Sequence, residues 1–110
     1  MNEYRRGMLY WGSLDKRRPL LVVSSDLFNT RAGWVTVVPG SSRLRPLITH
    51  VKLTRGEGGV ERPTMLLCEH VQTIPKTDVE PEPLGRPLTR GRMREIEAAL
   101  LVLLAIDIEA

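Results

Sequence analysis

Short apolar runs separated by polar turns dominate the first part of the chain. Residues 7–11 favour a strand, and residues 19–25 are a continuous apolar run of strand length. Residues 34–38 form a third such run, after turn-forming residues at 29–33. The second and third runs, with this turn between them, predict a β-hairpin.

Further strands are expected in the middle of the chain. Residues 48–53 alternate between two sets of side chains, as a half-buried strand does. Residues 64–67 open another apolar strand, which residues 71–74 continue or follow. Four prolines between positions 75 and 87 argue against regular structure, so we expect a connector there.

The last segment has the pattern of an amphipathic helix. Thr89 is the expected N-cap, and Leu88 and Met93 stand at the two positions that form a hydrophobic staple. The apolar residues that recur at helical spacing are Met93, Ile96, Leu100, Leu103 and Leu104. Residues 98–108 are apolar nearly all round, so we expect the sheet or a second copy of the chain to cover them.

These elements together predict a mainly β (α+β) fold. We expect a small, strongly bent antiparallel sheet or barrel of about five to seven strands, closed by a C-terminal helix. The 110 residues have the length of one domain, so residues 1–110 are expected to form a single unit. Apolar residues at 42% and charged residues at 26% are ordinary for a globular protein and argue against disorder.

The cysteine and histidine content limits compartment and cofactor chemistry. The one cysteine, Cys68, excludes an intramolecular disulfide and fits a reducing cytoplasm better than secretion. No run of about 18 apolar residues is present, so we expect no membrane span. Only His50, Cys68 and His70 could offer soft metal ligands, and neither a metal-site spacing nor a glycine-rich phosphate loop is present, so we expect no metal and no cofactor. Cys68 and His70 should share one face of a strand, and we interpret Cys68 as a small buried hydrophobe rather than a nucleophile.

The charges divide unevenly between the two halves of the chain. Residues 1–55 hold ten Lys and Arg against three acids, a net charge of +7, and residues 56–110 have a net charge of −4. All five aromatic residues also lie within the first 34 positions. Basic and aromatic side chains together favour a nucleic-acid surface, because cations attract phosphates and rings stack on bases. The other interpretation is a solvated basic face over a core that contains the aromatics.

Neighbouring arginines and serines supply the candidate chemistry. Arg17 and Arg18 stand directly before Pro19 and its apolar strand, so at least one guanidinium should emerge at the edge of that strand. Ser41 comes shortly after the third run, and a hairpin would return it to the side of Arg18. An arginine beside a hydroxyl can hold a phosphate and stabilise charge at a phosphoryl centre. Otherwise Arg18 is a solvated strand-end charge and Ser41 a turn former.

Six phrases in order along most of the chain resemble the MazF/PemK family of toxin endoribonucleases. They are RRGMLYW, RRPLLVVSSDLFN, VTVVPGSS, THVKL, LLCEHVQTIPK and LGRPLTRGRMREIEAALLVLL. The resemblance implies an SH3-like barrel with an appended helix, a homodimer, and a cognate antitoxin protein as partner. It also implies metal-independent cleavage of single-stranded RNA, in which the ribose 2′-hydroxyl attacks its own phosphate and leaves a cyclic phosphate and a free 5′-hydroxyl.

The same resemblance assigns roles to individual residues. The family's catalytic arginine corresponds to Arg18, and its threonine to Ser41, which keeps the hydroxyl. Members of the PemK branch use an aspartate as base where this chain has Glu69. Members of that branch use an arginine as the general acid where this chain has Leu67. Arg18 would therefore have to act as the acid, or else serve only to stabilise charge. The side chains expected to bind RNA are Arg17, Ser42, Arg43, His70 and Gln72.

Some positions depart from the family pattern. Met8 replaces the acid that follows the family's first glycine, and His70 replaces a glutamine, where it could stack on a base or carry a proton. The loop over residues 12–17 is several residues shorter than in many members, in which it commonly helps to read RNA and is displaced by antitoxin.

Two other functions remain open at this stage. A gyrase-poisoning toxin of the CcdB kind shares the barrel but binds a protein and cuts nothing. Chains of that kind lack the arginine-proline phrase, so Arg18 and Pro19 favour the ribonuclease. A non-catalytic RNA- or protein-binding barrel is the third interpretation, because Ser41 and Met8 depart from the family pattern.

Overall fold

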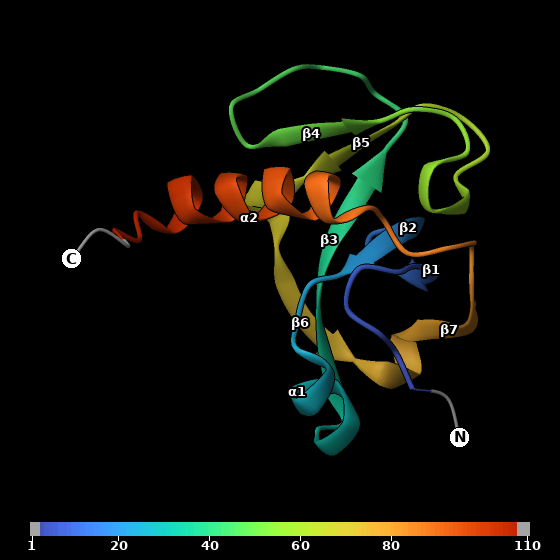
Figure 1. Ribbon diagram of the computed structural model, residues 1–110. Coiled ribbons are helices and arrows are strands. Elements are labelled where there is room, and N and C mark those ends of the chain that lie inside the picture. The colour runs from blue at the N-terminus through green and yellow to red at the C-terminus, as the bar shows by residue number, and fades with distance from the viewer. Residues whose placement is uncertain (1–2, 108–110) are drawn as a thin grey trace.

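The computed structural model describes residues 3–107 and consists of a bent sheet crossed by one long helix (Figure 1). The strands are β1 (Leu9–Ser13), β2 (Arg17–Val22), β3 (Trp34–Ser41), β4 (His50–Leu53), β5 (Thr64–Leu67), β6 (Gln72–Pro75) and β7 (Val79–Pro83). The α-helices are α1 (Asp26–Arg31) and α2 (Arg90–Leu104). Short 3-10 turns cover Glu57–Gly59, Cys68–His70 and Lys76–Asp78.

All strand pairs are antiparallel, and β3 lies at the centre of their arrangement. The order is β4-β5-β3-β2-β1-β7, with β6 paired to the beginning of β3. Trp34 to Val37 of β3 pair with β6, whereas Gly40 and Ser41 at its end pair with β5. Because its two ends have different partners, β3 belongs to both halves of the bent sheet. The expected bent antiparallel sheet with a C-terminal helix is confirmed.

Both faces of β2 are buried, which explains its continuous apolar run. Leu21 packs in a core cluster with Leu9, Leu66 and Ile96, on the side covered by α2. Its two neighbours, Leu20 and Val22, lie in the second cluster, with both buried tyrosines and Val35 among others. Side chains alternate between faces along a strand, so a strand that is covered on both sides has apolar residues at consecutive positions.

The beginning of α2 matches the sequence prediction. The Thr89 hydroxyl accepts a hydrogen bond from the backbone N–H of Arg92 at 3.1 Å. Leu88 is buried, and Met93 packs against the same core, so the predicted staple is present. Neither helix of the described residues 3–107 has the length and apolar content that a membrane crossing needs.

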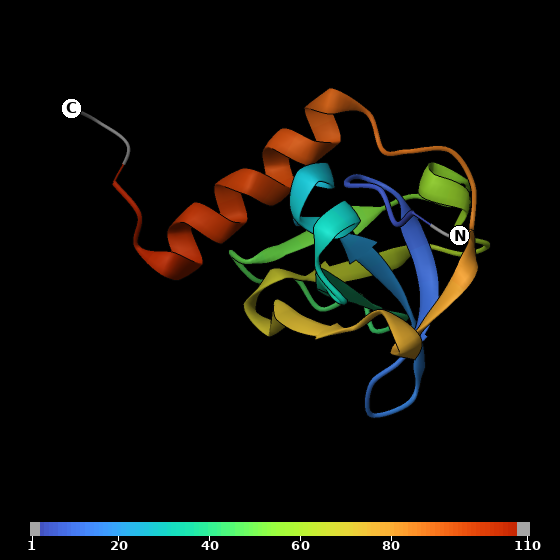
Figure 2. The same ribbon diagram turned by 90° about the horizontal axis from the view of Figure 1, so that it is seen from below.

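The C-terminal half of α2 extends beyond the sheet (Figure 2). Ile96 and Ala99 are fully covered, but the side chains of Val102 and Leu104 are 54% and 57% exposed. Of the two expected covers, the sheet therefore covers only part of this apolar segment in the single chain. The helix ends before Ala105, whose φ of 54° is left-handed, and position 108 of the predicted segment lies outside the described residues.

The connection between β2 and β3 is a short helix rather than the simple turn that the sequence predicts. The Ser25 hydroxyl caps α1 by accepting the N–H of Phe28 at 3.2 Å. Asn29 is buried, and its amide donates to the Ser24 carbonyl at 3.0 Å. This local polar network satisfies the buried Asn29 and positions β3 for pairing with β2, so the predicted hairpin is still formed.

The proline-rich segment is not irregular throughout. β7 pairs with β1 at two registered positions, Val79 opposite Gly12 and Pro83 opposite Tyr10. Among the residues that the structure describes, β7 pairs only with β1, so the other edge of β7 forms no strand pair. An edge strand tolerates proline because half of its backbone N–H groups need no partner. The connector prediction is therefore wrong for this strand.

Candidate active site

Arg18 is fixed at the beginning of β2 by contacts on two sides. Its Nε donates to Oδ1 of Asp15 at 2.8 Å, and its Nη2 donates to Oδ2 of Asp15 at 2.9 Å. Its Nη1 donates to the carbonyl oxygen of Gly40 at 3.3 Å. The following Pro19 favours extended backbone at Arg18, so the side chain leaves from a rigid strand rather than from a mobile loop. Only 20% of the Arg18 side chain is exposed.

The hairpin brings Arg18 to the backbone next to Ser41, although Ser41 itself lines neither of the two hollows that contain Arg18. The paired register of β2 and β3 ends at Leu20 opposite Pro39, and Arg18 and Ser41 each lie two positions beyond that pair. The bond from Arg18 to the Gly40 carbonyl supports this placement. The Ser41 oxygen accepts the backbone N–H of Arg43 at 3.1 Å, so the Ser41 hydroxyl proton stays available for a ligand.

Two hollows share Arg18 as a common wall. The larger hollow, about 540 Å³, is lined by Arg18 together with Asp15, His70, Gln72 and Asp78, among others. The smaller hollow has a volume of about 210 Å³. Arg17, Arg18 and Ser42 line it, together with residues of the segment 60–64 and Leu84. Four of the residues predicted to bind RNA therefore lie around Arg18, two in each hollow. Arg43 is exposed in the loop after β3, and it lines neither hollow.

Arg17 has a different environment from its neighbour Arg18. Its Nε and Nη2 donate to the two oxygens of Glu80 at 2.7 and 2.9 Å. Its guanidinium carbon also lies 4.3 Å from the ring centroid of Trp11, a cation–π contact. The hydrogen bond from Arg17 lowers the pKa of Glu80. Arg17 is thus ion-paired with Glu80 and held over Trp11 at the wall of the smaller hollow.

Cys68 and His70 do not share a face, contrary to the sequence prediction. Cys68–His70 form a 3-10 turn, in which successive side chains rotate by about a third of a turn. Cys68 points into the core beneath α2, and burial, together with the charge of Glu69, raises the pKa of its thiol to about 11. The side chain of His70 is 61% exposed and reaches the larger hollow. The interpretation of Cys68 as a buried hydrophobe is confirmed.

Glu69 lies outside both hollows and is engaged by the loop before β4. Its Oε1 accepts the Thr49 hydroxyl at 2.8 Å, and its Oε2 lies 2.7 Å from Nε2 of His50. Nδ1 of His50 lies 2.6 Å from the Arg45 carbonyl oxygen, so both nitrogens of this ring face acceptors. Burial alone would raise the pKa of Glu69, but the hydrogen bonds from His50, from its own backbone N–H and from Thr49 lower it. Nε2 of His70 lies 3.8 Å from the same Oε2.

Glu69 is consequently a weak proton acceptor, because its carboxylate is stabilised in the charged form. The titratable ring that faces Arg18 across the larger hollow is His70. Gln72 donates from Nε2 to the His70 carbonyl at 3.1 Å, which ties the end of the turn to β6. Within residues 3–107, no three His, Cys, Asp or Glu side chains come together in a way that could hold a metal ion.

Comparison with known proteins identifies the family. The family model described as PemK-like, MazF-like toxin of type II toxin-antitoxin system matches residues 5–104. The chain belongs to this family. The curated protein Endoribonuclease MazF3 of Mycobacterium tuberculosis (strain CDC 1551 / Oshkosh) is 31% identical over 71 residues, which are 64% of this chain and 68% of that protein.

Solved structures of MazF toxins share the fold of this chain. The Mycobacterium tuberculosis toxin MazF-mt6 matches with a TM-score of 0.82 and 26% identity, over 91% of this chain and 98% of that chain. An endoribonuclease in complex with its cognate antitoxin, from Mycobacterial species, matches with a TM-score of 0.83 and 22% identity, over 96% of this chain and 99% of that chain. The protein is thus a toxin of a type II toxin–antitoxin family whose relatives are endoribonucleases.

Sequence reasoning missed two residues of this toxin's site. Asp15 binds Arg18. The sequence feature that could have predicted this ion pair is an acid in a short hairpin loop, three positions before the arginine. His50 binds Glu69, and its signal was weaker, because the contact joins two segments 19 positions apart. Both are neighbours of predicted catalytic residues, and Asp15 also lines the larger hollow.

Proposed function

We propose that this toxin is a sequence-specific endoribonuclease that cleaves single-stranded RNA without a cofactor, and that Arg18 is the central residue of its active site. The observation that carries the proposal is the fixed guanidinium at the shared wall of two hollows. A guanidinium has five N–H donors, and Asp15 and Gly40 use three of them. The two remaining donors suit the oxygens of one phosphate, for which arginine has a matching geometry.

The cleavage step needs two proton transfers and stabilisation of charge. The ribose 2′-oxygen forms a bond to the adjacent phosphorus while the bond from phosphorus to the 5′-oxygen breaks. The 2′-hydroxyl proton goes to a base, and the 5′-oxygen receives a proton from an acid. The products are a 2′,3′-cyclic phosphate and a 5′-hydroxyl end.

Each of these needs has a candidate side chain. Arg18 faces the phosphate and stabilises the extra negative charge of the pentacoordinate phosphorus. The Ser41 hydroxyl follows Gly40, whose carbonyl accepts a hydrogen bond from Arg18, and it donates to a phosphate oxygen. His70 lines the same hollow as Arg18; its ring takes the 2′-hydroxyl proton as base and then returns a proton to the leaving 5′-oxygen as acid, while Glu69, whose Oε2 lies 3.8 Å from its Nε2, orients the ring. We thus assign Glu69 to support proton transfer through His70 rather than to act directly as base.

RNA binding extends from the larger hollow over the basic half of the chain. Gln72 lies beside His70 in that hollow and can hydrogen-bond a base. Arg43 is exposed at the turn after Ser41, where it can contact the RNA backbone. The +7 charge of residues 1–55 favours binding of a polyanion to the surface that these residues form.

We also assign protein partners to the toxin. An antitoxin with an acidic, partly apolar tail would fold onto the basic half, and a relative of the same fold is solved with its cognate antitoxin. A second copy of the toxin would cover the exposed apolar end of α2, making a homodimer. The lone buried cysteine agrees with a cytoplasmic setting.

The direct test is cleavage of a long single-stranded RNA by the purified toxin in EDTA. We expect fragments with 5′-hydroxyl ends, which a polynucleotide kinase labels without prior phosphatase treatment. Arg94→Ala, which removes an exposed arginine of α2 far along the chain from the hollows, should cut at the wild-type rate. Intact RNA, combined with gyrase inhibition or simple retention of the RNA, would favour the alternative functions instead.

A further inference from the structure

The smaller hollow combines an apolar floor with a cationic rim. Trp11, Pro19, Val60 and Leu84 form apolar parts of its wall. Lys16, Arg17, Arg18 and Arg62 also line it, against the single acid Glu61. Within residues 3–107, neither Lys16 nor Arg62 has an acidic group within ion-pair distance. Flat apolar surface beneath positive charge is the chemistry that holds a nucleobase attached to a phosphate.

We propose that the smaller hollow is a subsite for one nucleobase next to the scissile phosphate, and that Glu61 reads an amino group on that base. This rests on the proposed function, because the subsite gains its position from a phosphate on Arg18. Arg18 lines both hollows, so the nucleotides on the two sides of that phosphate face different hollows. At about 210 Å³ the smaller hollow is below the roughly 300–1,000 Å³ of sites for drug-sized ligands, and it suits a single base.

One wall of the subsite is a rigid planar layer. The Arg17 guanidinium lies over Trp11 and is held there by both oxygens of Glu80. A guanidinium that is fixed in this way can stack on a base, as arginine planes do in RNA complexes. Because Arg17 is already ordered, binding of the base does not cost the conformational entropy of this long side chain.

Another part of the wall is supported by two segments that pack closely at Gly59 and Gly85. A Cβ on Gly59 would lie 2.3 Å from the Leu84 backbone, and one on Gly85 would lie 2.7 Å from the Gly59 Cα. The turn that contains Gly59 is tied to α2, because Glu57 accepts hydrogen bonds from Nε and Nη2 of Arg92 at 2.9 and 2.8 Å. Glu61 and Arg62 follow this anchored turn directly, so they project from a fixed support.

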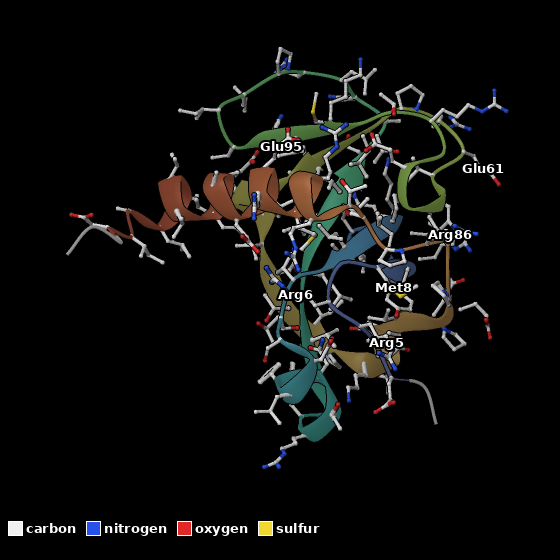
Figure 3. The ribbon with its side chains drawn as sticks, in the orientation of Figure 1. Arg5, Arg6, Met8, Glu61, Arg86 and Glu95 are labelled. Carbon is white, nitrogen blue, oxygen red and sulfur yellow. The ribbon has the colours of Figure 1, made fainter. Side chains whose placement is uncertain are left out.

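Glu61 supplies the selectivity of the subsite. It is exposed at the edge of the molecule in Figure 3, and it lines the smaller hollow. A carboxylate accepts hydrogen bonds and donates none, so it favours a base with an exocyclic amino group. Adenine, cytosine and guanine have such a group. Uracil has none, and its one ring N–H on the pairing edge lies between two carbonyl oxygens that repel a carboxylate. The subsite should therefore prefer these three bases to uracil.

Binding can be measured without any cleavage, because the chain has two tryptophans and only Trp11 lines the smaller hollow. The indole N–H signals of the full chain would be followed by NMR during titration with each nucleoside 5′-monophosphate, with Trp34→Phe used for assignment. We expect the Trp11 signal to shift with AMP, CMP and GMP at lower concentrations than with UMP, while the Trp34 signal stays. In Glu61→Gln, the preference for AMP, CMP and GMP over UMP should fall at least about fivefold.

The second arm sequences the cut ends of a randomised RNA. In Glu61→Gln, base preference should fall at least about fivefold at one position beside the cut and stay unchanged elsewhere. Glu82→Gln, an exposed acid of β7 outside the hollow, should keep the wild-type profile. A Trp11 signal that no nucleotide shifts, or a Glu61→Gln variant with unchanged preference, would overturn the subsite. A selective Trp11 shift without any RNA cleavage would instead contradict the proposed function and leave the subsite supported.

Discussion

The two oxygens of Asp15 accept hydrogen bonds from Nε and Nη2 of Arg18 across the loop that joins β1 to β2. The loop has three residues, 14–16, so Asp15 has little freedom to leave the arginine. The hydrogen bonds from Arg18 hold the pKa of Asp15 well below its usual range. Asp15 therefore stays ionised wherever RNA is stable, and it fixes the orientation of the Arg18 guanidinium.

Asp15→Asn should lower kcat about tenfold or more while KM changes little, because a misplaced charge-stabilising group mainly affects the transition state. Single-turnover and steady-state cleavage of one RNA would separate the two constants. Asp78→Asn is the matched control, since it removes another acid that lines the larger hollow but makes no contact with Arg18 that the structure shows. An Asp15→Asn enzyme with wild-type kcat would show that Arg18 needs no support.

Ser41 should contribute less than Arg18, because it offers one hydrogen bond and no charge. We expect Ser41→Ala to reduce cleavage by about tenfold, the loss of one neutral hydrogen bond. Ser41→Thr should keep most of the activity, because threonine retains the hydroxyl and suits a strand. Rates on the same RNA, with circular dichroism to check the fold, compare the two variants. Equal losses in both would contradict a role for the hydroxyl.

Glu57 and Arg92 should give the fold a defined acid sensitivity. The hydrogen bonds from Arg92, opposed by burial, lower the pKa of Glu57 from 4.5 to about 2. A carboxylate whose pKa is lower in the folded state stabilises it above pH 4.5, and this contribution is lost as the pH falls towards 2. Glu57→Gln should cost about 1–2 kcal/mol at pH 7 and much less near pH 2, as measured by urea unfolding. A cost independent of pH would contradict this.

The exposed end of α2 should mediate self-association. Leu104 is 57% exposed, and Val102 on the same segment is 54% exposed. Light scattering at micromolar concentration should give a dimer mass for the wild type and a monomer mass for Leu104→Glu, because a buried unpaired charge is costly. Glu97→Gln on the same helix is a control. A monomeric wild type would show that this surface has another use.

The sequence predicts the parts of this toxin that local patterns control. The apolar runs of β2 and β3 predict a hairpin, and that hairpin brings Arg18 to Gly40, the residue before Ser41. The N-cap at Thr89 is equally local, because the cap bond joins residues three positions apart.

The features that sequence reasoning missed depend on distant contacts. Cys68–His70 form a 3-10 turn because Cys68 packs in the core beneath α2, and that packing overrides the alternation of a strand. The pairing of β7 with β1 depends on the free edge of β1, which no local pattern reveals. Glu69 lines neither hollow, and its carboxylate is bound by His50 and Thr49, which lie 19 and 20 positions away in the sequence.

The central claim is that Arg18 stabilises the charge that develops on the phosphate. The most direct measurement is the single-turnover rate of RNA cleavage by Arg18→Ala and Arg18→Lys, with circular dichroism and unfolding to confirm the fold. We expect Arg18→Ala to lose at least about 100-fold, by analogy with the loss of one oxyanion donor. Arg18→Lys should recover little, because an ammonium lacks the paired donors of a guanidinium. A folded Arg18→Ala protein that cleaves RNA at the wild-type rate would show that the active site lies elsewhere.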